Sequence, residues 1–385
     1  MKRWLAVLSA TGLLGGCSTI TGWFSSSDTT EPPAPLVDFQ PSTTVRTLWT
    51  HDAGASGKDR SLTLRAAVRG NRVAVADPKG RVTLLEADTG TSIWEVDTRV
   101  PASAGPTLGD ALVVVGASDG QVVALEAESG TVRWQTRVSS EILSPPAIGR
   151  GVVVVRSLDG RLFGLDAQSG RRLWVYEKGV PLLSLRGTGA PTVAGELALN
   201  GFDGGRLVAI ALRDGRAVWE ARVGAPRGRS DLERMVDIDS APVVLGDAVY
   251  VVSYHGQVAA LELTSGRPAW QRDMSSSAGL AVDGRNVYVS DDQSHVWALD
   301  RFNGRPVWHQ ERLQARGLTA PVVLDRYVVV GDREGYLHWL RREDGEFAAR
   351  QQVDKAGFYA APEVDRNTVY AYSRSGVVEA LRPVD

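Results

Sequence analysis

The chain has 385 residues, of which 43% are apolar and 23% are charged, and its formal net charge is −2. This length exceeds an ordinary single hydrophobic core, so several domains or a repeat architecture are expected. With 43 basic against 45 acidic residues, the chain offers no electrostatic attraction to nucleic acid, and a polynucleotide partner is not expected.

Residues 1–16 have the pattern of a signal peptide. The basic pair Lys2-Arg3 precedes an apolar run, residues 4–14, that is too short to span a bilayer, and small residues follow. The segment ends in Leu14-Gly15-Gly16-Cys17, which resembles a bacterial lipobox. That resemblance implies cleavage before Cys17 and lipidation of its thiol. The alternative is an ordinary signal peptide that a cysteine follows by chance.

Residues 17–43 are expected to form the lipidated N-terminus and a flexible tether, because they are rich in serine, threonine and proline. Cys17 is the only cysteine, so its lipidation leaves no thiol for a disulfide, thiolate chemistry or a cysteine metal site. For such a lipoprotein, the sorting rules imply the outer membrane, since Ser18 follows the cysteine. The sequence therefore predicts a soluble body, residues 44–385, that a lipid anchor holds on the periplasmic side of that membrane.

A pattern of glycine, alternating apolar residues, Ala-Leu, then glycine and tryptophan recurs along the body. Its first positions are Gly80, Gly120, Gly160, Gly205, Gly256, Ser294, Gly335 and Gly376. In the second repeat, strands are expected over residues 105–108, 111–116, 121–126 and 131–137, with Asp119-Gly120 and Ser129-Gly130 as turns. Four-stranded units of about forty residues, repeated eight times, predict an all-β fold: an eight-bladed β-propeller of four-stranded antiparallel blades.

The two ends of the body are expected to close the ring. The last repeat stops after residue 382 without a fourth strand, whereas residues 45–49 form a fourth strand with no repeat of their own. Pairing this N-terminal strand with the last blade would remove an exposed sheet edge.

Seven repeats end in a tryptophan, and the remaining one has Ala349 instead. These residues are Trp49, Trp94, Trp134, Trp174, Trp219, Trp270 and Trp308. They could form an aromatic binding surface, but large rings repeated in register favour packing between blades.

No catalytic, cofactor-binding or metal-binding residues are predicted. The histidines, His51, His255, His295, His309 and His338, lie in separate repeats without metal-ligand spacing. The sequence contains no phosphate-binding P-loop and no Gly-x-Ser-x-Gly motif. The repeat resembles those of pyrroloquinoline-quinone (PQQ) dehydrogenases, which implies an alternative reading as a periplasmic quinoprotein dehydrogenase. Those enzymes have a vicinal cysteine pair beside the cofactor, and this chain has one cysteine.

Two consecutive junctions between repeats are long, and inserted residues in a propeller emerge as surface loops. Residues 180–187 join the third and fourth repeats, and residues 224–239 join the fourth and fifth. Blade topology places both loops on one face. Candidate partner-binding residues there are Leu183, Leu185, Arg186, Asp237 and Asp239. Aliphatic side chains beside charges of both signs suit a protein partner. Alternatively, the leucines pack into a blade and the aspartates flank a strand start.

The lipobox, the eight repeats and the Pro-x-Leu-Ser-Leu-Arg-Gly and Asp-x-Asp segments together resemble the BamB family, lipoproteins of the outer-membrane β-barrel assembly (BAM) machine. The resemblance implies a monomeric, non-enzymatic scaffold whose five candidate residues contact the POTRA domains of BamA, chiefly the third. It also implies help with the insertion of outer-membrane proteins, which could bind directly while unfolded. Leu182 and Ala349 depart from the family pattern. A third reading is a module that binds a small ligand or peptidoglycan.

Overall fold

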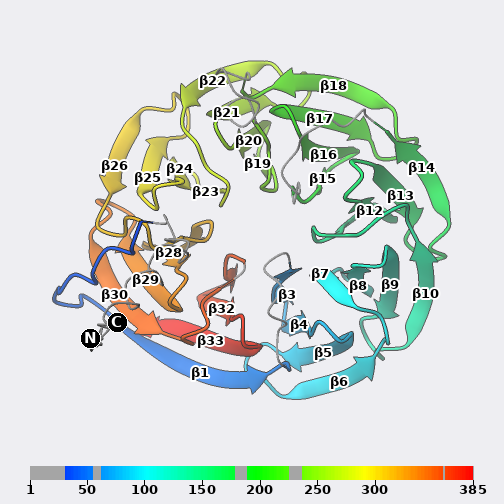
Figure 1. The fold of residues 1–385 in the computed structure, drawn as a ribbon, viewed down its shortest axis with the longest axis horizontal. Helices are drawn as coiled ribbons and strands as arrows, with labels where there is room; N and C mark the ends of the chain where they lie inside the picture. The colour runs from blue at the N-terminus through cyan, green and yellow to red at the C-terminus, as the bar shows by residue number, and fades with distance from the viewer. Residues whose placement is uncertain (1–30, 55–61, 178–188, 225–235, 359, 385) are drawn as a thin grey trace, which may run out of the picture. The chain divides into compact units, whose positions relative to one another are not determined.

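The computed structural model describes residues 31–54, 62–177, 189–224, 236–358 and 360–384. From residue 33 onward, eight β-sheets stand side by side around a ring (Figure 1). Each sheet is one blade, and the blades follow one another in sequence order. The predicted all-β, eight-bladed propeller is therefore confirmed.

Within each four-stranded blade, successive strands lie farther from the ring centre, so the first strand is the innermost (Figure 1). Blades 1 and 2 consist of β3 (Ala67–Arg69), β4 (Arg72–Ala76), β5 (Arg81–Glu86), β6 (Ser92–Asp97), β7 (Ala102–Leu108), β8 (Leu112–Ala117), β9 (Gln121–Glu126) and β10 (Val132–Arg137). Blades 3 and 4 consist of β11 (Ala147–Gly149), β12 (Val152–Arg156), β13 (Leu162–Asp166), β14 (Arg172–Tyr176), β15 (Thr192–Ala194), β16 (Leu197–Phe202), β17 (Arg206–Ala211) and β18 (Ala217–Arg222). Blades 5 and 6 consist of β19 (Val243–Leu245), β20 (Ala248–Val252), β21 (Gln257–Glu262), β22 (Pro268–Asp273), β23 (Leu280–Val282), β24 (Asn286–Ser290), β25 (Val296–Asp300) and β26 (Pro306–Gln310). Blade 7 consists of β27 (Val322–Leu324), β28 (Tyr327–Gly331), β29 (Tyr336–Arg341) and β30 (Phe347–Gln352), and blade 8 of β31 (Glu363–Asp365), β32 (Thr368–Tyr372), β33 (Val377–Val384) and β1 (Thr44–Asp52).

The ring closes through β1, which is the outermost strand of blade 8. It pairs antiparallel with β33, from Thr44 opposite Val384 to Asp52 opposite Val377. The closure predicted from the two ends of the body is thus confirmed.

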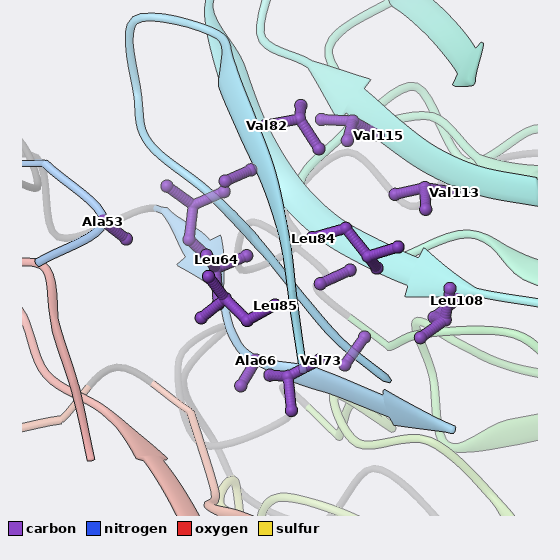
Figure 2. Close-up of a cluster of buried hydrophobic side chains, with 14 of the residues drawn as sticks. Ala53, Leu64, Ala66, Val73, Val82, Leu84, Leu85, Leu108, Val113 and Val115 are labelled. Atoms are coloured by element: carbon purple, nitrogen blue, oxygen red, sulfur yellow. The ribbon is translucent and has the colours of Figure 1, made fainter. Parts of the chain in front are cut away.

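Blade 2 differs from the prediction because it carries a fifth strand. After β1 the chain crosses from the outside of the ring to its centre, and on the way β2 (Thr63–Leu64) pairs parallel with β7. The N–H of Arg65 donates to the carbonyl of Gly105 at 3.0 Å, and the Leu64 side chain is fully buried (Figure 2). Backbone groups that enter the interior need partners, and the inner edge of blade 2 supplies them.

The hydrophobic core lies between the blades. Middle strands such as β5 and β8 bury side chains on both faces, so Leu84 of blade 1 lies near Val113 and Val115 of blade 2 (Figure 2). Outer strands such as β6 and β10 are buried on one face only, and their other face is exposed.

The repeat tryptophans join each blade to the next. Trp134 of β10 donates its indole N–H to the carbonyl of Ala167 at 2.9 Å, and its ring lies against Gly170 in the turn between β13 and β14. A Cβ atom added to Gly170, which has a φ of +69°, would lie 2.6 Å from that ring. All seven repeat tryptophans make this pair of contacts with the following blade. Their predicted role in packing between blades is confirmed.

Ala349 has a structural explanation. The third and fourth strands of blade 8, β33 and β1, come from opposite ends of the sequence, so no hairpin turn joins them to receive an indole from blade 7. In blade 7 the large side chain is instead Trp339 of β29, which lies opposite Ala349 in the sheet and is fully buried. In blade 2 the order is reversed, with Ala124 on the third strand and Trp134 on the fourth.

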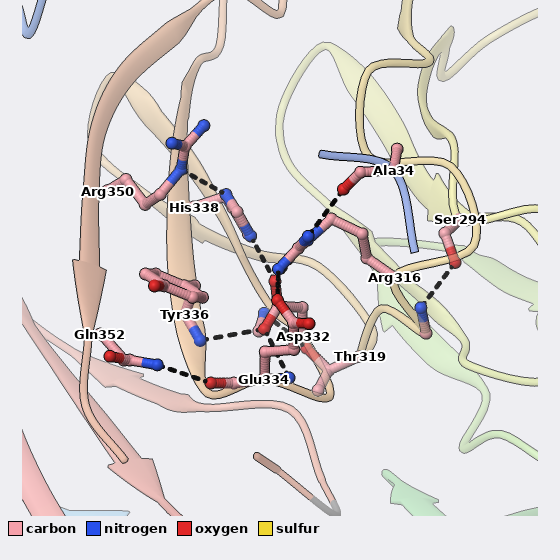
Figure 3. Close-up of polar contacts among 12 residues, drawn as sticks. Ala34, Ser294, Arg316, Thr319, Asp332, Glu334, Tyr336, His338, Arg350 and Gln352 are labelled. Atoms are coloured by element: carbon pink, nitrogen blue, oxygen red, sulfur yellow. Dashed lines mark hydrogen bonds and ion pairs between the residues drawn. The ribbon is translucent and has the colours of Figure 1, made fainter. Parts of the chain in front are cut away.

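Residues 34–43, which we call the N-terminal strap, differ from the flexible tether that the sequence predicted. Arg316 donates to the carbonyl of Ala34 at 2.8 Å (Figure 3), and the Phe39 ring stacks on Phe347 with centroids 5.2 Å apart. The N–H of Ser42 donates to the carbonyl of Ala348 on β30 at 2.9 Å. Because the strap has apolar side chains that blade 7 can bury, the compact body begins near Pro33 and not at residue 44.

Arg316 belongs to a buried network of charged side chains in blade 7 (Figure 3). Its Nε donates to Asp332 at 2.7 Å, and Nε2 of His338 lies 2.8 Å from the same carboxylate. Arg350 approaches Nδ1 of His338 at 3.4 Å and can only donate, so Nδ1 accepts and the ring is neutral. Burial lowers the pKa of His338 below its usual 6.5; Asp332 opposes this shift, and both arginines add to it.

The joint between blades can be tested with a matched pair of glycines in blade 3. Gly170→Ala and Gly151→Ala both place a side chain at positive φ, +69° and +76°, but a Cβ at Gly151 has no heavy atom within 4 Å. We expect both changes to cost about 1 kcal/mol for the backbone, and Gly170→Ala to cost about 1 kcal/mol more through its clash with Trp134. Urea unfolding measures both; equal losses would contradict the proposed joint.

The network in blade 7 predicts a pH dependence of stability. Below pH 6.5, His338 binds a proton in the unfolded chain, but in the folded protein it stays neutral until the pH reaches its lowered pKa. The free energy of unfolding should therefore fall as the pH decreases through this range. His338→Gln should reduce this slope, whereas His309→Gln, at a largely exposed site, should leave it unchanged. Unfolding curves between pH 7 and pH 5 provide the measurement, and an unchanged slope in His338→Gln would count against the network.

Candidate functional site

Both long loops start from and return to one face of the ring. Strands alternate in direction within a blade, so the connections between blades open on the same face as the turns between second and third strands. We call this the loop face. Leu183, Leu185 and Arg186 lie outside the described residues. The structure shows the residues from which the loops start and to which they return.

The two loops meet at their feet. Gly189, just after the first loop, lies against Ile238, near the end of the second: a Cβ at Gly189 would lie 2.5 Å from the carbonyl oxygen of Ile238. Gly201 of blade 4 is equally close to the Ile238 side chain. The segments that the sequence predicted as neighbours are therefore in contact where they join the blades.

Asp237 links the turns of blades 4 and 5. Its Oδ1 accepts from the N–H of Gly204 at 3.2 Å, and its carbonyl accepts from the N–H of Tyr254 at 2.8 Å. Its side chain is only 3% exposed, and Asp239 is half-buried. These positions fit the strand-flanking alternative, and contact of either aspartate with a partner stays a prediction.

Arg156 is a member of this site that sequence reasoning missed. It ends β12 in blade 3 and is 4% exposed. Its Nη1 donates to the carbonyl of Gly201 at 2.7 Å and to that of Gly189 at 3.3 Å, and its Nη2 lies 3.6 Å from Asp203. One guanidinium thus holds the foot of the first loop against blade 4.

The charge of Arg156 also acts on the second loop. Burial lowers the pKa of this guanidinium, and the carboxylates of Asp203, Asp239 and Asp237 oppose the shift. An arginine surrounded by carboxylates stays charged. The result is a buried ionic cluster in which blade 3 supplies the cation and blades 4 and 5 supply the anions.

The described part of the chain contains no group of three or more His, Cys, Asp or Glu side chains arranged as metal ligands, and no helical segment there has the length and hydrophobicity that a membrane crossing requires. His255 of the fifth repeat and His295 and His309 of the sixth line one cavity, so the expectation that all the histidines lie in separate repeats is wrong for the last two. Sequence spacing could not reveal this, because the three come from turns and strands of adjacent blades.

Comparisons with known proteins match nearly the whole chain. The family model described as outer membrane protein assembly factor BamB matches residues 38–122, 78–310 and 304–385. The protein of that name from Pseudomonas aeruginosa is 46% identical over 368 residues, which cover 96% of this chain and 97% of that protein. The one from Escherichia coli is 36% identical over 390 residues and covers 99% and 98%.

Solved structures give the same fold. The crystal structure of BamB from Moraxella catarrhalis matches with a TM-score of 0.79 and 29% identity, covering 88% of this chain and all of that one. The quinohemoprotein alcohol dehydrogenase of Comamonas testosteroni has a TM-score of 0.68 at 14% identity and covers 88% and 76%. The second likeness is to the fold alone.

The ionic cluster predicts that Arg156 stabilises both loop feet. Arg156→Met should cost about 3 kcal/mol, because it leaves buried carboxylates without their cation, and it should speed hydrogen exchange at the N–H of Tyr254. Arg150→Met is the control, since its pair with Glu196 is largely exposed and worth less than about 1 kcal/mol. Urea unfolding measures the loss of stability, and hydrogen exchange measures the opening at Tyr254. If Arg156→Met loses no more stability than Arg150→Met, the role of Arg156 is contradicted.

Proposed function

Since this chain belongs to the family of outer membrane protein assembly factor BamB, we propose that it is a non-enzymatic scaffold of the BAM complex that assists the folding and insertion of outer-membrane β-barrel proteins. The observation that carries this proposal in the structure is the contact between the two loop feet on the loop face. A surface made of two loops from adjacent blades can receive another protein domain without covalent chemistry.

The proposed partner is the periplasmic POTRA region of BamA, chiefly its third domain. Leu183, Leu185 and Arg186 would supply the contacts of the first loop, because an apolar patch with a guanidinium is typical of binding hot spots. Asp237 and Asp239 would act mainly by holding the second loop, since one is buried and the other half-buried. Arg156 holds the described ends of both loops in place, and a preorganised surface loses less free energy on binding.

The proposed location is the periplasmic side of the outer membrane, with the anchor at Cys17. The lipobox pattern and Ser18 support it. Docking of the strap on blade 7 leaves residues 18–33 as the connection between anchor and body.

Direct contact with unfolded outer-membrane proteins has support from the outer strands. Exposed aliphatic side chains recur there, and they include Ile93, Val132, Leu173, Val218 and Val307. An edge strand with apolar side chains can pair with an extended segment by β-augmentation. We propose this as a second, weaker mode of binding.

A periplasmic quinoprotein dehydrogenase is the alternative function. The observation that favours it is the shared propeller fold, at 14% identity. A chain with one cysteine cannot form the vicinal cysteine pair of those enzymes, and a shared fold does not carry an activity across.

The test is binding of residues 18–385 to the purified POTRA domains of BamA, measured by calorimetry. Arg186→Ala should weaken binding about 30-fold or more, which corresponds to about 2 kcal/mol for a hot-spot residue. Arg213→Ala is the matched control, because this arginine is exposed in a turn between third and fourth strands, on the opposite face of blade 4.

The outcomes separate the parts of the proposal. Loss of binding in folded Arg186→Ala, with normal binding by Arg213→Ala, supports the loop face as the partner surface. Normal binding by both variants would reject that face, and no binding by the unaltered chain would reject BamA as the direct partner.

A further inference from the structure

A groove runs along the loop face from the foot of the second loop to blade 6. Its larger part is a cavity of about 540 Å³ between blades 5 and 6. A neighbouring cavity of about 390 Å³ shares His255 and Asp273 with it and reaches Gly224, the first residue of the second loop. We call the two together the rim groove, and it is continuous with the proposed partner surface.

Stacked aromatic pairs form two walls of the larger cavity. Tyr254 stacks on His255 with centroids 3.8 Å apart, and Trp297 stacks on His309 with centroids 4.6 Å apart. His255 adopts a φ of 49°, a backbone conformation that residues other than glycine rarely take. The indole of Trp297 is held in place, because its N–H donates to Asp291 at 2.8 Å.

The larger cavity is lined by more carboxylates than guanidinium groups. Its lining includes the carboxylates of Asp273, Asp291, Asp292 and Glu311 against the single guanidinium of Arg272. Asp291 accepts from the backbone N–H of His295 at 2.8 Å, and Asp292 accepts from the N–H of Ser277 at 2.9 Å. Backbone donors of this kind orient a carboxylate and leave its negative charge in place. The imidazole of His295 also lies 3.3 Å from Asp291, and that of His309 lies 3.8 Å from Glu311.

Aromatic faces and carboxylates in one cavity select a particular chemistry. A guanidinium or ammonium group is attracted to the face of an aromatic ring through a cation–π interaction, and to a carboxylate through a charge-assisted hydrogen bond. The cavity holds a whole side chain, and its walls suit the apolar stem of arginine or lysine as well as its charged end.

We propose that the larger cavity binds an arginine or lysine side chain of the protein partner that the two loops receive. This inference rests on the proposed function for the identity of the partner, because the rim groove reaches the foot of the second loop. The cavity itself does not depend on the proposed function, because residues of blades 5 and 6 form it.

The experiment uses N-acetyl-arginine amide as the probe and follows the indole N–H of Trp297 by NMR in the chain of residues 18–385. Trp297→Phe assigns the resonance. The probe should shift it in a saturable way, and N-acetyl-citrulline amide, which has nearly the same shape without the charge, should not. The double variant Asp291→Asn/Asp292→Asn should weaken the arginine effect about tenfold or more. Asp110→Asn is the control, since this carboxylate is exposed and pairs with Arg69 in another part of the ring.

Each outcome decides one part. An equal shift with the citrulline probe, no saturable shift with the arginine probe, or an unchanged effect in the double variant would overturn the cation site. If the arginine probe binds but the double variant keeps full affinity for the POTRA domains, the link to that partner is wrong. If the probe binds while the unaltered chain does not bind those domains, the proposed function fails and the cation site stands.

Discussion

The contact between a tryptophan and a glycine turn is the interaction on which this ring depends. Each blade is a small sheet that cannot bury both faces by itself, and the indole of its outer strand fixes the next blade at a set distance and angle. The hydrogen bond from the indole N–H makes the contact directional, whereas apolar packing alone would not. Regular spacing of the blades then brings their connections and the turns between second and third strands onto a common face, where the two long loops start.

Much of the fold could be predicted from the sequence because it is a repeated local pattern. The strands of blade 2 begin and end within a few residues of their expected positions, since turn glycines and alternating apolar residues determine them. The strap and β2 escaped prediction for the opposite reason. Phe39 and Leu64 lie outside any repeat, and only the assembled ring provides the surfaces that bury them.

The candidate site was predictable only in part. Interruptions of the period located both loops, but they could not show that Asp237 is buried or that Arg156 lies beside it. Arg156 follows four valines in a strand that is otherwise apolar, and this could have signalled a buried cation with partners elsewhere. The histidines of the rim groove gave no such signal, because residues of two adjacent blades meet there only in the folded ring.

Closure by β1 has a consequence for how the protein reaches its folded state. The strand that completes blade 8 is synthesised long before its partner β33, and the hydrogen bond between Thr47 and Glu379 spans 332 positions. Contacts so distant in sequence form late, because the loop between them must first lose its freedom. Until β33 is present, the early strand therefore has an open edge, and an open edge is the part of a sheet most prone to aggregation during folding.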